Sequence, residues 1–235
     1  MRYAFYLTPD EDHPLTIAAA NWLGSNPFTG ETRALQAAGE FDAAELTALT
    51  ADPRRYGFHG TLKAPFPLAA AKTEAQLLAA FDGFAAECAP FQIPEMTLGQ
   101  LGPFFALVPA ADCPELQALA DETVRRFEPF RAPLSAADFS RRKSDSLTDL
   151  HRANLLSWGY PYVFESFQFH MTLTGPVPAD RQAAMKALLG ETFAPFIGEP
   201  LSVTSLALFT EHARGAPFTV HTLLPLGGTS QRKMA

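Results

Sequence analysis

The chain has 235 residues, with 18 basic and 25 acidic side chains, a net charge of −7 and an apolar fraction of 47%. A charged fraction of only 18% beside that apolar fraction excludes a disordered protein. The negative charge argues against sequence-independent binding of DNA or RNA, which requires many neutralised phosphates. We therefore expect a globular protein of one large or two small domains, and favour an enzyme.

The cysteines and the N-terminal residues indicate the cellular compartment in which we expect the protein. Cys88 and Cys113 are too few for a disulfide scaffold and form no CxxC pair. The segment 1–7 lacks the apolar core of a signal peptide, and no apolar run approaches the roughly 20 residues of a membrane helix. These features predict a cytoplasmic protein with reduced thiols and no membrane segment.

The first half of the chain predicts a mixture of strands and helices. In chain order, we expect a strand at 2–8, helices at 14–24 and 42–50, a strand at 57–62 closed by Pro65 and Pro67, a helix at 73–87 with Thr73 as N-cap, strands at 91–98 and 103–109, and a helix at 114–127 opened by Pro114.

The second half repeats the order strand, helix, strand, strand. It predicts a strand at 165–173, a helix at 180–193, strands at 201–209 and 217–224, and a flexible polar tail at 227–235. The order indicates an internal duplication within a single bilobal domain, 1–226, with repeats at about 50–110 and 161–226. The N-terminal strand and the linker helices would complete the lobes, and 128–157 could belong to either half.

The duplication is clearest in two octapeptides, Phe58–Pro65 and Phe169–Pro176. Phe, His, Thr, Leu and Pro coincide in register, 111 residues apart. A single copy would be read as an ordinary strand histidine, buried or exposed. Two copies in equivalent positions point to function.

Side chains alternate between the two faces of a strand, which places His59, Thr61 and Lys63 together. In the second copy His170, Thr172 and Thr174 share a face. If the two halves face each other, two His–Thr pairs meet in one cleft.

Such a cleft suits a cyclic phosphodiester. One imidazole takes a proton from water while the other protonates the leaving alkoxide, and the hydroxyls donate to phosphoryl oxygens. Two histidines without a cluster of Asp, Glu or Cys make a poor metal site, so we expect no metal and no cofactor.

The tetrapeptides His59–Leu62 and His170–Leu173 resemble the two signatures of the 2H phosphoesterase superfamily, which includes 2′,5′ RNA ligase-like proteins and cyclic nucleotide phosphodiesterases. The resemblance implies an α+β fold of two pseudo-symmetric lobes, with antiparallel sheets lining a central cleft and helices outside. It also implies that His59 and His170 are the acid–base pair, and that Thr61 and Thr172 donate to phosphate oxygens.

Three stretches, Arg141–Ser144, Trp158–Val163 and Phe169–Pro176, are similar to a narrower branch of that superfamily. Its members are often encoded with phosphonate-metabolism (carbon–phosphorus lyase) genes. Because phosphonate breakdown passes through a cyclic ribose phosphate, this resemblance makes that compound a substrate to test.

Four further residues are candidates for substrate binding: Lys63, Tyr56, Arg141 and Tyr160. Lys63 could reach a phosphate by strand parity, or be a solvated surface lysine. Tyr56 follows two arginines, so a role at the cleft edge competes with an ordinary polar turn.

Arg141 belongs to a compact basic cluster, 141–143, that could capture an anion or form a solvated face. Tyr160, with Tyr162, could stack on a base or sugar, or pack at the lobe junction.

The sequence thus predicts a metal-independent hydrolase that acts, as a monomer, on a small cyclic phosphate derived from a nucleotide or sugar. One alternative is an enzyme of the same chemistry that acts on RNA ends, on 2′,3′-cyclic phosphates or 2′,5′ linkages. Another is a nucleotide-binding regulator without catalysis, which the two intact motifs disfavour.

Overall fold

A computed structural model describes residues 1–135, 138–139, 147–228 and 233–234. Most of the strands form one antiparallel sheet in the order β10-β9-β8-β1-β2-β6-β5-β4, and β3 and β7 form a separate pair. The strands are β1 (Arg2–Leu7), β2 (Gly60–Phe66), β3 (Phe91–Ile93), β4 (Met96–Leu101), β5 (Phe104–Pro109), β6 (Met171–Thr172), β7 (Leu201–Val203), β8 (Ser205–Glu211), β9 (Thr219–Pro225) and β10 (Lys233–Met234).

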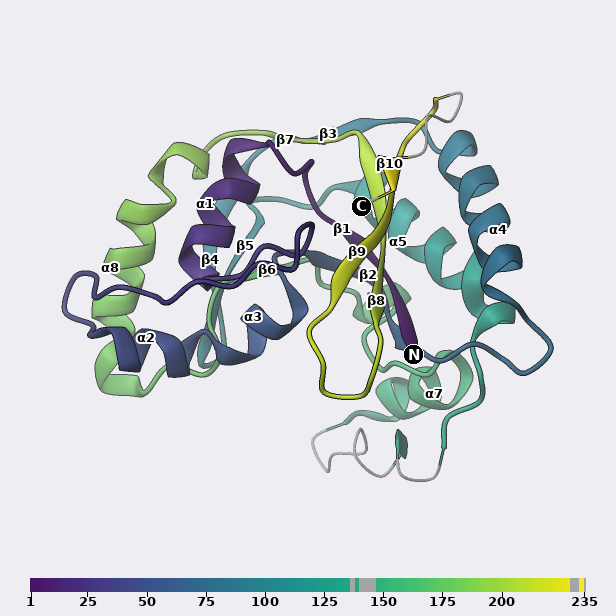
Figure 1. The fold of residues 1–235 in the computed structure, drawn as a ribbon, viewed down its shortest axis with the longest axis horizontal. Helices are drawn as coiled ribbons and strands as arrows, with labels where there is room; N and C mark the ends of the chain where they lie inside the picture. Colours follow the sequence, from purple (N-terminus) through teal and green to yellow (C-terminus); the bar gives the residue numbers. More distant parts are fainter. Residues whose placement is uncertain (136–137, 140–146, 229–232, 235) are drawn as a thin grey trace.

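Helices flank the sheet on both sides in the view of Figure 1, with α4 and α5 at one end and α1 and α8 at the other. The α-helices are α1 (Pro14–Leu23), α2 (Ala43–Leu49), α3 (Ala51–Tyr56), α4 (Glu74–Glu87), α5 (Pro114–Phe127), α7 (Asp149–Trp158) and α8 (Gln182–Thr192). The predicted α+β class with antiparallel strands is therefore confirmed.

Each sequence repeat contributes its hairpin to the half of the sheet that contains the motif strand of the other repeat. β2 and α4 of the first repeat are followed by the β4–β5 hairpin, which pairs with β6 of the second repeat. In turn, the β8–β9 hairpin of the second repeat reaches β2 through β1. Each half of the sheet therefore contains strands from both repeats, and neither repeat can form its half alone.

The repeats touch each other through equivalent strands. β2 pairs with β6 at Gly60 and Met171, the residues that follow the two motif histidines. β3 pairs with β7 over three residues, from Phe91 and Val203 to Ile93 and Leu201. Contacts between like strands are what a two-fold relation between the halves requires, as the sequence repeat predicts.

Two predicted strands are divided in the structure. The segment predicted as a strand at 91–98 becomes β3 and β4, separated at Pro94, which has no N–H to continue a ladder. The segment at 201–209 becomes β7 and β8, separated at Thr204. The two interruptions fall at matching places in the repeats. Each segment therefore contributes one strand to the large sheet and one to the β3–β7 pair.

β2 begins later and ends later than the sequence predicts, at Gly60–Phe66 rather than 57–62. Pro65 does not close it, because the pairing with β1 is irregular there: one β1 residue, Ala4, faces two β2 residues between the pairs Tyr3–Phe66 and Phe5–Lys63. A bulge of this kind accepts a proline, since the bulged residue donates no ladder hydrogen bond.

The predicted strand at 165–173 is reduced to Met171–Thr172. A single helical turn occupies Phe164–Ser166, in which the amides of Ser166 and Phe167 donate to the carbonyls of Val163 and Phe164. These local hydrogen bonds replace the ladder that a longer strand would need.

At the C-terminal end, where the sequence predicts a flexible tail, Lys233 and Met234 pair with Leu223 and Thr222 of β9. Residues 229–232 and 235 of that tail lie outside the described residues.

The apolar residues of the two motifs enter the core, as strand alternation predicts. Phe58, Leu62, Phe169 and Leu173 are all buried in one cluster with α1, α4, α5 and α8. Burial of each such side chain contributes about 1.5–3 kcal/mol. Thr73 is the N-cap of α4, as the sequence predicts, and Gln76 completes a capping box with it. The opposite face of the sheet carries a smaller cluster, which includes Tyr6 and Phe209.

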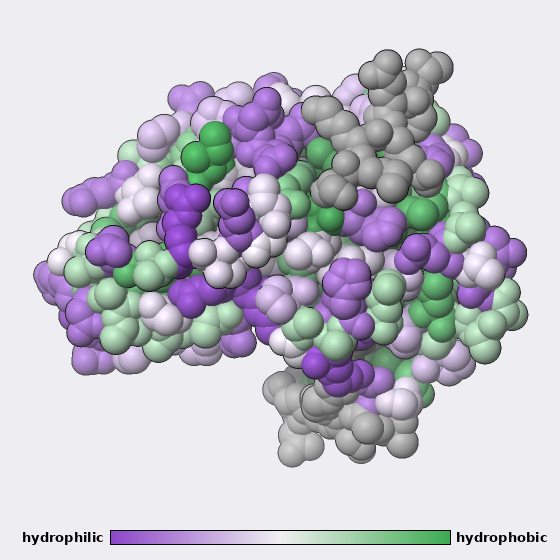
Figure 2. All heavy atoms as spheres, in the orientation of Figure 1, coloured by the Kyte–Doolittle hydropathy of each residue, from purple (hydrophilic) through white to green (hydrophobic). Residues whose placement is uncertain are grey.

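The face of the molecule in Figure 2 mixes hydrophilic and apolar residues without one continuous apolar surface. Within the part of the chain that the structure describes, no helix has the length and apolar character needed to cross a membrane.

A substitution at Gly60, where β2 and β6 meet, tests the packing between the two motif strands. A Cβ added there would overlap the ring of Phe169. We expect Gly60→Ala to lower the free energy of unfolding by about 1–3 kcal/mol, as overpacking does, measured by urea denaturation. Gly83 in α4 is the matched control, because a Cβ there meets nothing within 4 Å and Gly83→Ala should stabilise the helix by up to about 1 kcal/mol. Equal effects of the two substitutions would contradict the packing.

Candidate active site

The register between β2 and β6 brings the two motifs face to face. Gly60 pairs with Met171 in an antiparallel ladder, so Thr61 lies across from His170 and His59 lies across from Thr172. Directly opposite residues project to the same face of a sheet. Each histidine therefore has the threonine of the other motif as its cross-strand neighbour, and all four side chains project to one face.

Both imidazoles are fixed by the same local hydrogen bond. Nδ1 of His59 lies 2.9 Å from the carbonyl oxygen of Gly57, and Nδ1 of His170 lies 2.8 Å from that of Gln168. A carbonyl oxygen only accepts, so in each neutral ring Nδ1 carries the hydrogen and Nε2 keeps its lone pair. Nε2 of His59 lies 3.1 Å from Oγ1 of Thr61, whose hydroxyl donates to it.

Interactions on either side hold the motif strands in place. The hydroxyl of Thr8, just after β1, donates to the carbonyl of Phe58. The indole of Trp22 in α1 donates to the carbonyl of Leu173 at 2.8 Å. The backbone on which the histidines sit is therefore tied to β1 on one side and to α1 on the other.

Both imidazole rings have aromatic neighbours, and both histidines are half-buried. His59 stacks on Tyr6, with ring centroids 3.6 Å apart, and His170 lies 5.8 Å from Phe104. Burial lowers the pKa of His59 to about 4, and the nearby His170 contributes in the same direction. Burial also lowers the pKa of His170. Both rings are consequently neutral at pH 7, and each is ready to accept a proton at Nε2.

A cavity of about 500 Å3 opens on this face. Thr61 and His170 lie in its wall together with the aromatic rings of Phe104, Tyr160 and Tyr162. A cavity of this size holds a small ligand, and aromatic walls suit a flat or apolar group.

One protein family matches more than half of the chain. Residues 61–219 match the family described as "Protein of unknown function (DUF1045)". The chain belongs to this family. The match begins inside the first motif, after His59, and includes the whole of the second.

Two curated relatives extend the likeness over nearly the whole chain. Both are named "Ribose 1,5-bisphosphate phosphokinase PhnN". The protein from Janthinobacterium sp. (strain Marseille) is 35% identical, over 98% of this chain and 52% of its own length. The protein from Laribacter hongkongensis (strain HLHK9) is 32% identical, over 99% of this chain and 54% of its own length. The DUF1045 chain thus spans about half the length of the curated relatives it matches.

Solved structures resemble the DUF1045 chain more remotely. The crystal structure of a phosphoesterase gives a TM-score of 0.42 at 13% identity, covering 96% of this chain and 97% of the other. The structure of E. coli LigT complexed with 3′-AMP gives a TM-score of 0.45 at 15% identity, with the same two coverages.

Of the predicted binding residues, the structure brings Tyr160 and Tyr56 to the site. Tyr160 lines the cavity together with Thr61 and His170. The ring of Tyr56 lies 6.3 Å from that of His59. Arg54, by contrast, is structural: its guanidinium donates to the carbonyl of Leu23 and to Thr50.

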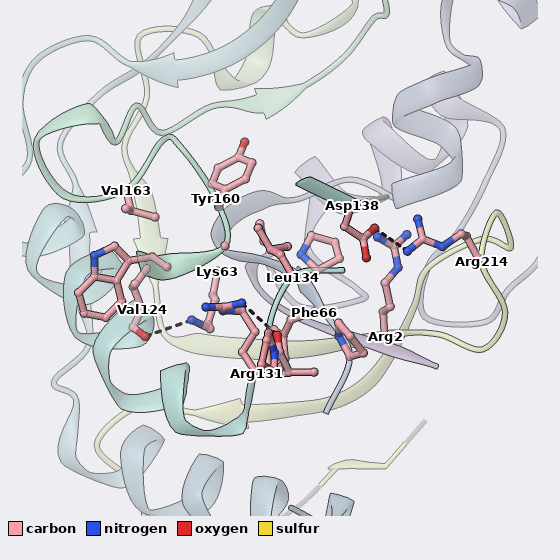
Figure 3. A pocket seen from close by; sticks show the side chains of 17 residues that line it. Arg2, Lys63, Phe66, Val124, Arg131, Leu134, Asp138, Tyr160, Val163 and Arg214 are labelled. Atoms are coloured by element: carbon pink, nitrogen blue, oxygen red, sulfur yellow. Dashed lines mark hydrogen bonds and ion pairs between the residues drawn. The ribbon is translucent and has the colours of Figure 1, made fainter. Parts of the chain in front are cut away.

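Lys63 is not brought to the site. Its Nζ lies 2.8 Å from a carboxylate oxygen of Glu128. It also donates to the carbonyl of Val124 in α5 (Figure 3). A second irregularity in the β1–β2 pairing, between Phe5–Lys63 and Tyr6–Thr61, breaks the alternation on which the prediction rested. Thr174 in the second motif is also buried, where its hydroxyl accepts from the amide of Phe105.

The remaining predictions concern Arg141 and metals. Arg141, with the basic cluster 141–143, lies outside the described residues. In the described ranges, no group of three or more His, Cys, Asp or Glu side chains is gathered as a metal site would need.

Sequence reasoning missed Tyr6 and Phe104, which flank the two histidines. Tyr6 is one aromatic residue in an apolar strand, and Phe104 opens a strand of the other repeat. Neither has a local signal, because only the pairing of strands distant in sequence brings them beside the imidazoles.

The pKa of His59 gives a direct test of the buried, stacked ring. We expect its imidazole to titrate near pH 4 in an NMR titration, with His59→Ala used to assign the resonance. Because the folded pKa lies below the unfolded value near 6.5, the unfolded state binds the proton first. This group should therefore weaken the fold as the pH falls from about 6.5 to 4, and contribute no such penalty above 6.5. A midpoint near 6.5 would contradict the described burial.

Proposed function

We propose that this DUF1045 protein is a phosphoesterase of the 2H type that hydrolyses a cyclic phosphodiester. The observation that supports this most is the β2–β6 register, which sets each histidine opposite the threonine of the other motif. Two bases and two hydroxyl donors on one face, beside a cavity for a small ligand, are what in-line attack on a phosphodiester requires.

The chemistry follows from the two Nε2 atoms. A water molecule attacks phosphorus and gives a proton to one neutral imidazole, and the ring P–O bond on the opposite side breaks. The other imidazole, protonated, gives its proton to the departing alkoxide. The products are a phosphomonoester and a hydroxyl group on the same molecule, and the second imidazole regains its proton from the first through solvent.

Binding of the substrate would cause one of the two imidazoles to become protonated. Burial holds the pKa of both imidazoles low in the free protein. A phosphate anion between them favours the charged form and raises their pKa. Thr61, whose hydroxyl donates to Nε2 of His59 in the free protein, would then turn toward a phosphoryl oxygen.

The substrate we favour is a small cyclic phosphate on a sugar or nucleotide. The cavity volume and the rings of Phe104, Tyr160 and Tyr162 support a small molecule. The relatives' name points to a ribose phosphate, since the chain matches about half of proteins named for ribose 1,5-bisphosphate. A ribose carrying a cyclic phosphate, as formed in phosphonate breakdown, joins these two observations.

The histidines carry the first test. His59→Ala and His170→Ala should each lower turnover of a cyclic phosphate by about 10²- to 10⁴-fold, in a panel of cyclic sugar phosphates, cyclic nucleotides and RNA ends, each with and without EDTA. His221→Ala is the matched control, since that ring contacts Thr222 and Glu74 away from the cavity. We expect EDTA to have no effect.

The results of that panel separate the alternatives. No turnover of any substrate would exclude the enzyme and favour a binding protein. Turnover abolished by EDTA would exclude the metal-free mechanism. Preference for RNA ends, with binding that weakens steeply as salt is added, would favour the RNA-end enzyme.

The threonines carry a second test. Thr61→Val and Thr172→Val remove a hydroxyl donor at nearly constant volume, and each should lower kcat by about 10²-fold. Thr61→Ser and Thr172→Ser keep the hydroxyl and should restore most of the rate. If valine and serine variants are equally active in steady-state assays, the hydroxyls do not bind the phosphoryl group.

A further inference from the structure

The two motif histidines differ in what covers the face of each ring. His59 stacks on Tyr6, with ring centroids 3.6 Å apart and an angle of 19° between the ring planes. His170 has Phe104 beside it at 5.8 Å and an angle of 55°, which is too steep for stacking. The sequence repeat makes the two motifs alike, so this difference arises from the strands that flank them.

Strand pairing places Tyr6 beside the first motif. Tyr6 of β1 pairs with Thr61 of β2, so their side chains project to one face of the sheet. His59 comes two residues before Thr61, at the diagonal position that an aromatic side chain reaches. In the other half of the sheet, Thr172 pairs with Ala106 of β5, which has no ring to stack on a histidine. The two-fold relation is therefore broken beside the histidines.

The ring of Tyr6 is itself held in place. The side chain is buried in the cluster on this face of the sheet, with the rings of Phe209 and Phe218 at 4.9 and 6.2 Å. On the side away from Thr61, it pairs with Ala207 of β8. Burial raises the pKa of its phenol well above the usual value, so Tyr6 is uncharged at pH 7. It is a fixed, neutral wall for the imidazole.

Tyr6 adds a second constraint on the imidazole of His59. The carbonyl of Gly57 accepts from Nδ1–H and fixes the edge of the ring, while Tyr6 fixes its plane. Together these contacts direct Nε2 to the hydroxyl of Thr61, 3.1 Å away. In the second motif, the carbonyl of Gln168 fixes the edge of the ring in the same way, but no stacked ring fixes its plane.

The surroundings favour protonation of His170 over that of His59. His170 and Thr61 lie in the cavity wall, where an anionic substrate would bind, whereas His59 is not among the described residues of that wall. A positive charge on His170 lowers the pKa of His59. The causes that act on the pKa of His170 are burial and the carbonyl of Gln168.

The other groups that face His59 provide no negative charge. They are the phenol rings of Tyr6 from β1 and Tyr56 from α3, and the apolar ring of Phe209 from β8. Arg55 on α3 lies over the ring of Tyr56, 4.5 Å from its centroid. Within the described part of the chain, no carboxylate forms an ion pair with either motif histidine. A charge on His59 therefore has nothing to stabilise it.

We propose that Tyr6 is a positioning residue that holds His59 as the uncharged imidazole, so that His170 is the ring that takes up a proton when an anion binds. The roles in the reaction rest on the proposed function. The oxygen of water bonds to phosphorus and its proton goes to Nε2 of His59. The ring P–O bond breaks, and the proton on Nε2 of His170 goes to the departing alkoxide. Tyr6 acts through His59 and not on the substrate.

An NMR titration of the wild-type chain tests the order of protonation without catalysis. The two imidazole resonances, assigned with His59→Ala and His170→Ala, are followed with and without inorganic phosphate. We expect His170 to protonate at the higher pH in both series. Phosphate should raise the midpoint of His170 by at least about 0.5 pH unit more than that of His59. The reverse order, equal midpoints, or no response to phosphate would overturn the proposal.

Variants of Tyr6 test the positioning itself. Tyr6→Leu removes the stacked ring, and the midpoint of His59 should rise by about 1 pH unit or more because the imidazole gains solvent. With a cyclic phosphate as substrate, kcat should fall about tenfold or more while KM changes less than about twofold. Tyr6→Phe keeps the stacking, and should return both the midpoint and kcat to near their wild-type values.

Phe218→Leu is the matched control. It removes a ring from the same buried cluster, 6.2 Å from Tyr6, without removing the ring that stacks on His59. It should leave the midpoint of His59 and kcat unchanged, and urea denaturation shows whether each variant is folded. If Tyr6→Leu does not fold, Tyr6→Met takes its place, because a flexible methionine fills more of the space. The wild-type titration needs neither variant.

Failure of this proposal and failure of the proposed function give different results. If no cyclic phosphate is turned over, the proposed function is wrong, while the order of the two midpoints and their response to Tyr6→Leu still decide the role of Tyr6. If cyclic phosphates are turned over but Tyr6→Leu leaves kcat and the midpoint of His59 unchanged, Tyr6 has no positioning role. A fall in kcat that Phe218→Leu reproduces would indicate a loss of packing only, and would also overturn the proposal.

Discussion

The contact between Gly60 and Met171 is the constraint on which the site depends. Among the described residues it is the pair that joins β2 to β6, and it connects the two halves of the sheet at the residues that follow the two histidines. Antiparallel pairing then leaves no freedom: each histidine lies opposite the threonine of the other motif. A slip of one residue would turn one motif's histidine and threonine to the opposite face.

Packing around this contact explains why the first motif has Gly60 where the second has Met171. Phe169 packs over Gly60, where any side chain would overlap its ring, whereas the equivalent Met171 is itself fully buried. The two-fold relation between the repeats is therefore broken at its centre by packing. The exchange of hairpins adds a second consequence, because neither repeat can supply the neighbours of its own histidine without strands from the other.

The setting of the histidines decides their chemistry. Tyr6 stacks on His59 and Phe104 lies beside His170, and the carbonyls of Gly57 and Gln168 accept from Nδ1–H, so Nε2 of each neutral imidazole keeps its lone pair. A site of this kind gains a proton only with an anionic ligand, which couples binding to protonation.

The sequence by itself determined the α+β class, and it predicted the duplication and the two His–Thr pairs, because these depend on residue type and a repeated local spacing. It predicted the helices at 14–24, 73–87 and 114–127 closely, since apolar spacing and end signals such as Thr73 and Pro114 are local. Only the tertiary structure decided that Lys63 leaves the site, because bulges depend on the partner strand. It alone brought Tyr6 and Phe104 to the histidines, since strand pairing across more than fifty residues leaves no local trace in the sequence.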